Sequence, residues 1–152
     1  MMTEENAVSD PGEEEIEQGL LAVATSPSKF CTALLGFTPF PYQMELLEDP
    51  SKNIVVCAAR QVGKSKIVGA RALWFAFAHE KTATYIVAAT QRQSSMMFDG
   101  ILDYVETNEL ILESVVRKTR TQLHLTNGAR LFRYPAEERV RPFAERRQVL
   151  LL

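Results

Sequence analysis

Short apolar runs and amphipathic stretches follow one another through the middle of the chain. Ile54 to Cys57 and Thr84 to Ala88 are continuous apolar runs rich in β-branched residues, as in strands that are buried on both faces. Apolar residues in 64–79 and 93–106 recur every three or four positions, which predicts helices with one buried face. This alternation predicts an α/β fold, a parallel sheet with right-handed crossovers flanked by helices.

The first third of the chain indicates helices only. Residues 15–36 form one helical pattern, which Ser26-Pro27 interrupts, and residues 42–48 form a short second one. The proline-rich connector before the second helix is expected to be extended, because each proline disfavours helix in the residue before it. Residues 1–14 have many acids and few apolar residues, which indicates a disordered acidic tail ahead of a partial domain over 15–152.

The last third changes to a strand pattern. Residues 121–126 and 129–134 flank Asn127-Gly128, and Asn-Gly accepts the positive φ angles of a tight hairpin turn. The apolar residues of the two arms fit no single register. A charged loop is expected over 135–148, followed by a third apolar strand over 149–152 that leaves the sheet incomplete, with an aggregation-prone edge.

Composition excludes several classes of protein. The chain has 152 residues, 46% hydrophobic and 24% charged, which is typical of one globular domain. There is no apolar run of about 18 residues, so a transmembrane helix is not expected, and the acidic start does not resemble a targeting signal. Two cysteines make no disulfide framework, and Cys57 is expected to be a buried thiol in a reducing cytoplasm.

The net charge of −2 conceals an asymmetry along the chain. Residues 1–20 hold seven acids and no Lys or Arg, whereas residues 117–147 hold nine Lys or Arg and three acids. A basic half indicates a polyanionic partner, although a solvated loop face would have the same composition.

The segment Ala58-Ala59-Arg60-Gln61-Val62-Gly63-Lys64-Ser65 lies between a predicted strand and a predicted helix. It is a variant of the phosphate-binding loop, with alanine in place of the first glycine. Gly63 lets the backbone approach a phosphate, and the helix N-terminus attracts the anion. Lys64 would contact the β- and γ-phosphates of ATP, and the Ser65 hydroxyl would bind Mg²⁺. The alternative is a helix N-terminus with a surface lysine.

Side chains inside and upstream of this loop are further candidates. Arg60 could stabilise charge on the γ-phosphate as arginine fingers do, or be an ordinary surface arginine. The Gln43 amide could donate to and accept from an adenine edge. Tyr42 or Phe40 could stack on the base, or pack in the core. We expect nucleotide contacts from Tyr42, Gln43 and the loop residues Ala59, Arg60, Gln61, Val62, Gly63, Lys64 and Ser65.

Four segments follow one another along the chain: Phe40-Pro41-Tyr42-Gln43, the loop at 58–65, Val87 to Gln93 and Asn127 to Leu131. Together they resemble the N-terminal ATPase domain of the large terminase subunit of tailed bacteriophages, the motor that packages DNA into proheads. The similarity extends over residues 36–152. It implies a RecA-like P-loop fold and, in the full-length protein, ATP hydrolysis that drives translocation of double-stranded DNA, with Lys64 and Arg60 as catalytic residues.

The resemblance also implies partners and a cellular location. These are double-stranded DNA, the small terminase subunit, the portal protein and a homo-oligomeric ring, in the cytoplasm of a bacterial host cell and without a membrane. Gln91, Arg92 and Gln93 could contact the DNA backbone, or simply cap and solvate a helix start.

This sequence departs from the family in two main ways. The family continues from the third apolar strand into Asp-Glu, which holds Mg²⁺ and activates water, and then into an RNase H-like nuclease; neither is present by Leu152. We therefore expect this chain to bind ATP poorly and to turn it over negligibly. The alternatives are a non-catalytic nucleotide- or DNA-binding remnant and a helicase-like ATPase fragment of superfamily 2; Arg60-Gln61 and the Asn-Gly hairpin favour the terminase over the helicase.

Overall fold

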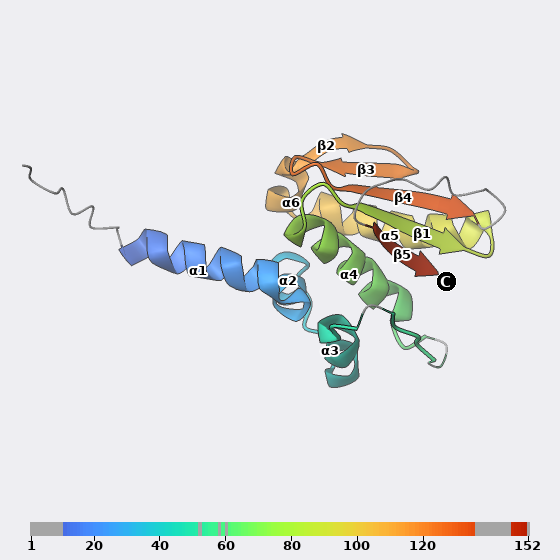
Figure 1. The fold of residues 1–152 in the computed structure, drawn as a ribbon, viewed down its shortest axis with the longest axis horizontal. Coiled ribbons are helices and arrows are strands. Elements are labelled where there is room, and N and C mark those ends of the chain that lie inside the picture. Colours follow the sequence, from blue (N-terminus) through green and yellow to red (C-terminus); the bar gives the residue numbers. More distant parts are fainter. Residues whose placement is uncertain (1–10, 52, 58, 60, 136–146, 152) are drawn as a thin grey trace, which may run out of the picture.

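The computed structural model describes residues 11–51, 53–57, 59, 61–135 and 147–151. A single sheet carries helices on one face, and an N-terminal helical arm extends away from it (Figure 1). The helices are α1 (Pro11–Thr25), α2 (Pro27–Leu34), α3 (Pro41–Glu48), α4 (Lys64–Ala78), α5 (Gln91–Thr107) and α6 (Glu109–Glu113). The strands are β1 (Ala83–Ala88), β2 (Val115–Lys118), β3 (Gln122–Leu125), β4 (Arg130–Pro135) and β5 (Arg147–Leu151).

The sheet is mixed, with the order β2-β3-β4-β1-β5. β1 pairs in parallel with β4 and β5, whereas β2, β3 and β4 are antiparallel. The carboxyl ends of the three parallel strands therefore meet at one edge of the sheet. The predicted parallel sheet is thus present, although the segment 54–57 does not belong to it. β2 and α6 were not predicted, because each is short and mostly exposed, with no clear apolar period.

The hairpin at Asn127-Gly128 is confirmed, and the structure settles its register. Leu123 opposes Leu131, and both are buried in the core on the helical side of the sheet. Gln122 opposes Phe132, which packs instead with Tyr85 on the other face. Phe132 and the leucines belong to opposite faces, since side chains alternate along a strand, and this is why no single apolar pairing accounts for all of them.

The predicted break at Ser26-Pro27 separates α1 from α2. The Ser26 hydroxyl accepts a hydrogen bond from the Lys29 N–H, and Pro27 takes the first helical position, which is the favoured start of a helix. α1 begins at Pro11, so Pro11 to Glu14 are helical and the predicted tail is shorter than 1–14. Acidic residues suit the positive end of a helix. Residues 1–10 lie outside the described part.

The prediction of a buried strand over Ile54–Cys57 is wrong. These residues belong to no helix or strand, and Val55 is 96% exposed. Cys57, predicted to be a buried thiol, is also exposed. A β-branched run becomes a strand only where a neighbouring strand supplies hydrogen-bond partners, and no strand of the described sheet pairs with this segment.

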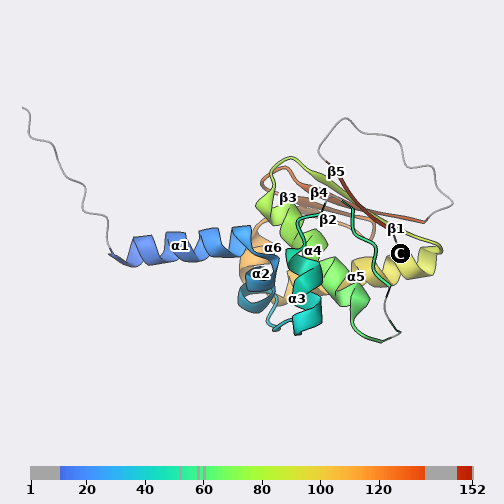
Figure 2. The same ribbon diagram turned by 60° about the horizontal axis from the view of Figure 1, so that its bottom comes forward.

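The core lies between the sheet and the pair α4 and α5, which cover one face (Figure 2). Ile67 and Leu73 of α4 and Phe98 and Ile101 of α5 are almost fully buried there. The hairpin is tied to the same layer, because the Asn127 side chain donates to the Ala76 carbonyl at the end of α4, with a distance of 2.8 Å. No helix in the described ranges is long and apolar enough to cross a membrane.

Candidate functional site

The predicted phosphate loop leads directly into α4. Gly63 is the N-cap of this helix and has a φ angle of 78°, in the left-handed region, which glycine adopts readily. A Cβ atom at Gly63 would also lie 3.0 Å from the Gln43 Nε2 atom. The backbone angle therefore favours glycine here, and a side chain would in addition press on the Gln43 amide. Gly63 has no side chain that could cap α4, and the first N–H groups of any α-helix lack carbonyl partners within the helix.

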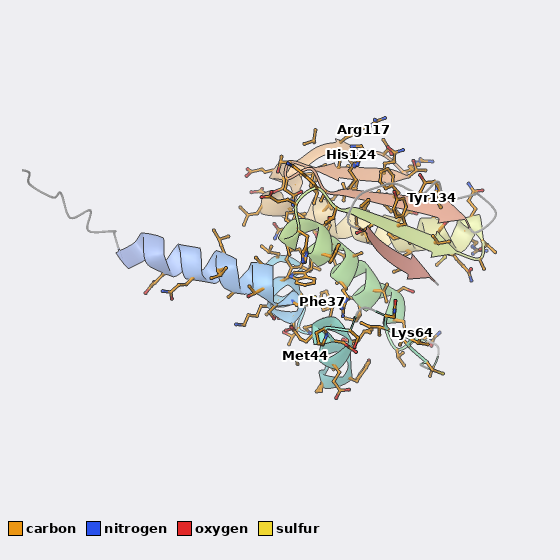
Figure 3. All side chains as sticks on the ribbon, in the orientation of Figure 1. Phe37, Met44, Lys64, Arg117, His124 and Tyr134 are labelled. Atoms are coloured by element: carbon orange, nitrogen blue, oxygen red, sulfur yellow. The ribbon has the colours of Figure 1, made fainter. Side chains whose placement is uncertain are left out.

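Lys64 and Ser65 form the first turn of α4 (Figure 3). The Lys64 side chain turns back across the loop, and its Nζ atom donates to the Ala59 carbonyl at 3.0 Å. The Ser65 side chain is exposed. Ala58 and Arg60 lie outside the described residues, so the role expected of Arg60 stays a prediction.

The upstream residues Phe40, Tyr42 and Gln43 lie at the start of α3, against the loop. The Phe40 and Tyr42 rings are 6.0 Å apart at an interplanar angle of 7°, and their exposed fractions are 62% and 53%. The sequence left core packing open for these two rings, and their exposure rules it out. The Tyr42 hydroxyl donates to the Val62 carbonyl at 3.1 Å.

Gln43, in contrast, is buried, with an exposed fraction of 8%. Its Oε1 atom accepts the Phe40 N–H at 3.0 Å. Its Nε2 atom contacts the Tyr42 hydroxyl at 3.3 Å and the Val62 carbonyl at 3.4 Å. The amide thus faces the protein, where it joins α3 to the phosphate loop.

Arg71 is a residue of this region that the sequence analysis missed. Its guanidinium group donates to the carbonyls of Leu46, Leu47 and Asp49, at the C-terminal end of α3. Burial lowers the pKa of Arg71, against the charges of Asp49 and Glu48, which raise it. The available signal was a lone charged residue between Ala70 and Ala72, in the apolar stretch that follows Lys66. Arg71 holds α3 against α4, the helix that begins with Lys64.

The segment after β1 begins α5. The Thr90 hydroxyl caps this helix by accepting from the Gln93 N–H at 3.3 Å. Gln91, Arg92 and Gln93 have exposed side chains. Thr90 therefore caps α5, and the side chains of Gln91, Arg92 and Gln93 do not. Their predicted contact with DNA stays a prediction.

Some of the Lys and Arg side chains in the basic region, residues 117–147, already contact other residues of the protein, so not all of them face a partner. Arg117 and Arg120 are exposed, but Lys118 forms an ion pair with Glu106 at 2.6 Å. Arg133 donates to the Ser95 hydroxyl and to the carbonyls of Arg120 and Gln91. Of the remaining members, Arg139, Arg141 and Arg146 lie outside the described residues.

His124 reports on the electrostatics of this region, beside Arg117 (Figure 3). Burial lowers the pKa of His124, and the charges of Arg117 and Arg130 lower it further. A neutral imidazole is therefore favoured among the arginines. Within the described ranges, no group of three His, Cys, Asp or Glu residues could hold a metal ion.

A hollow of about 320 Å³ lies between α4 and α5, next to the first turn of α4. Ser65 and Lys66 form part of its wall, with Asp103 and Tyr104 opposite on α5. Gly100 leaves open space there, because nothing lies within 4 Å of a Cβ built on it. The hollow is thus continuous with the exposed side of Ser65.

Comparison with known proteins gives consistent matches. Residues 55–144 match the family described as terminase large subunit, T4-like-virus type, N-terminal. The terminase large subunit of Thermus phage G20c is 30% identical over 100 residues, 65% of this chain and 21% of that protein. That of Thermus virus P23-45 is 31% identical over 97 residues, 64% of this chain and 19% of that protein. The chain thus spans about one fifth of the length of these relatives.

Solved structures are similar in fold. The large terminase ATPase domain of Thermus phage P74-26 superposes with a TM-score of 0.61 at 23% identity, over 70% of this chain and 49% of that one. The large terminase of bacteriophage HK97 gives a TM-score of 0.63 at 17% identity, over 74% of this chain and 26% of that one.

Proposed function

This chain belongs to the family of T4-like terminase large subunits, and we propose that it is a nucleotide-binding part of a DNA-packaging motor, with ATP and Mg²⁺ bound at the loop 58–65. The observation that carries the proposal is the left-handed Gly63 directly before Lys64 and Ser65 at the start of a 15-residue helix. This arrangement directs backbone N–H groups and a lysine toward a bound phosphate.

The residues present fit the phosphates and the metal. The N–H groups at the N-terminus of α4 would donate to anionic oxygens. Lys64 already reaches a loop oxygen, the Ala59 carbonyl, and would exchange this contact for the β- and γ-phosphates. The exposed Ser65 hydroxyl is a hard oxygen ligand suited to Mg²⁺, which would neutralise phosphate charge when bound. Arg60 would add charge near the γ-phosphate.

The base of the nucleotide would lie on the exposed pair of rings. Phe40 and Tyr42 present parallel faces to solvent, and the Tyr42 hydroxyl touches the loop at Val62. An aromatic surface beside a phosphate site suits a purine, because stacking needs only a π-face.

In the whole protein, hydrolysis of ATP would drive double-stranded DNA into the prohead. This wider part of the proposal includes the small terminase subunit, the portal protein and a homo-oligomeric ring as partners. The exposed Arg117 and Arg120 would contribute to contacts with DNA phosphates. Family membership argues against the helicase-like alternative.

Titration with fluorescently labelled ATP and Mg²⁺ tests nucleotide binding. Lys64→Ala removes a charge-assisted hydrogen bond worth about 1.5–3 kcal/mol, so affinity should fall by about tenfold or more. Lys29→Ala, at an exposed position on α2, is the matched control and should bind like the wild type. Equal binding by all three proteins would show that the loop does not hold the phosphates.

A further inference from the structure

The hydrogen-bonding capacity of the Gln43 amide is directed to the protein. A glutamine amide has two N–H donors and one carbonyl acceptor. Both Nε2 contacts are to protein oxygens, the Tyr42 hydroxyl and the Val62 carbonyl, and Oε1 accepts the Phe40 N–H. With only 8% of the residue exposed, turning this amide toward a base would break these contacts and leave buried groups unpaired, at a cost.

The contacted carbonyl lies next to the left-handed Gly63 of the predicted phosphate loop. Val62 shares its peptide group with Gly63, whose φ angle of 78° sets the direction of the chain into α4. Two donors converge on this single carbonyl, the Tyr42 hydroxyl at 3.1 Å and the Gln43 Nε2 at 3.4 Å. The orientation of the Val62–Gly63 peptide is therefore coupled to α3.

α3 is a firm anchor for this coupling, because it is held at both ends. At its start, the Gln43 side chain accepts the N–H of the N-cap residue Phe40, which is one half of a capping box. At its end, Arg71 of α4 donates to three carbonyls in the last turn.

We propose that Gln43 is a positioning residue for the phosphate loop, acting on bound phosphates through the Val62 carbonyl, and that it does not read the base. This inference rests on the proposed nucleotide site but concerns how the loop is held. On this proposal, Gln43 supports the binding of every nucleoside triphosphate and of inorganic tripolyphosphate equally. Contacts with the base come from the rings of Phe40 and Tyr42.

Affinities for three anions separate the two roles of Gln43. Gln43→Met removes both donors without adding charge. The affinities for ATP, GTP and tripolyphosphate, each with Mg²⁺, should fall by a similar factor of about tenfold, the equivalent of about 1.4 kcal/mol. A loss confined to ATP, with tripolyphosphate bound as in the wild type, would overturn the proposal and assign Gln43 to the adenine.

A second measurement does not depend on nucleotide binding. Gln43→Glu keeps the acceptor for the Phe40 N–H, so α3 stays capped, but places a carboxylate against the Val62 carbonyl. In ¹⁵N relaxation experiments, the order parameter of the Gly63 amide should fall from about 0.85 toward 0.6 or below, while the amides of α3 stay rigid. Tyr42→Phe should produce a smaller decrease, and Gln18→Glu, at an exposed position on α1, none.

The two measurements distinguish an error in the proposed nucleotide site from an error in the positioning role of Gln43. If wild type and Lys64→Ala bind tripolyphosphate equally, the proposed nucleotide site is wrong, and the relaxation data still decide whether Gln43 holds the loop. If the Gly63 amide is as rigid in Gln43→Glu and Tyr42→Phe as in the wild type, the positioning role is wrong, whatever the binding data show.

Discussion

Glycine has opposite effects at two positions of this chain. Gly63 has a φ angle of 78° and approaches the Gln43 side chain, so Gly63→Ala should lower the free energy of unfolding by about 1–3 kcal/mol. Gly100 lies in α5 with open space around its missing side chain. Gly100→Ala should raise that free energy by about 0.5–1 kcal/mol, because alanine favours helix. Urea unfolding of both variants provides the measurement, and two changes of the same sign would contradict this account of Gly63.

The two cysteines should differ sharply in reactivity. Cys31 is fully buried, and burial, with a smaller effect of the Glu48 charge, raises its pKa to about 12. Cys57 is exposed. A thiol reagent such as DTNB should therefore modify one cysteine in the folded protein and both after unfolding, since the thiolate is the reactive form. Cys57→Ser should abolish the native reaction; a reaction that persists in this variant would show that Cys31 is reached by the reagent in the folded protein.

At the scale of elements, a single carboxylate joins α3 to the start of α2. Glu48 accepts hydrogen bonds from the Ser26 and Ser28 hydroxyls and from the Ser28 N–H. Burial raises the pKa of Glu48, but the hydrogen bonds from Ser28 and Ser26 outweigh it, so the pKa lies below its ordinary value of 4.5. These bonds hold the end of α3 against the N-terminus of α2.

This lowered pKa predicts how stability depends on pH. A group that titrates lower in the folded state stabilises it above the unfolded pKa, and the contribution is lost as the pH falls through the folded pKa. Glu48→Gln should therefore reduce stability at pH 7 and weaken the loss of stability below about pH 4.5. Urea unfolding from pH 7 down to pH 3 measures this. Glu45→Gln, exposed on the same helix, should retain the wild-type dependence.

At the scale of the whole molecule, charge is divided along the sequence between the acidic residues 1–20 and the basic residues 117–147. Binding to a short double-stranded DNA should be weak and should weaken further with salt, because each neutralised phosphate releases counterions. Arg117→Ala should reduce the slope of log affinity against log salt by about 0.9. Lys29→Ala, on α2, should leave the slope unchanged. Fluorescence anisotropy measures both.

The acidic N-terminus should compete with DNA for this surface. Deleting residues 1–10, which precede α1 and include Glu4, Glu5 and Asp10, should tighten DNA binding, most strongly at low salt, where charges are least screened. An affinity that responds neither to salt nor to this deletion would refute an electrostatic DNA surface.

Local pattern alone determined much of this molecule. The spacing of apolar residues located α4 and α5, Ser26-Pro27 divided the first two helices, and Asn127-Gly128 placed the hairpin. Gly63-Lys64-Ser65 predicted the start of α4 and a phosphate loop there without reference to distant residues. Such features depend on a residue and its neighbours within about one turn of helix or one β-turn, and the sequence states that information directly.

Only the tertiary structure decided which segments found partners. Ile54 to Cys57 has the composition of a buried strand but no partner strand among the described residues, and Phe132 faces away from the leucines that obscured the hairpin register. Gln43 meets the Val62 carbonyl, and Arg71 meets the end of α3, across about 20 to 25 residues of chain. A strand needs hydrogen bonds from another strand, and a buried polar side chain needs a partner wherever the fold supplies one. Those partners are remote in the sequence, so the local pattern could not specify them.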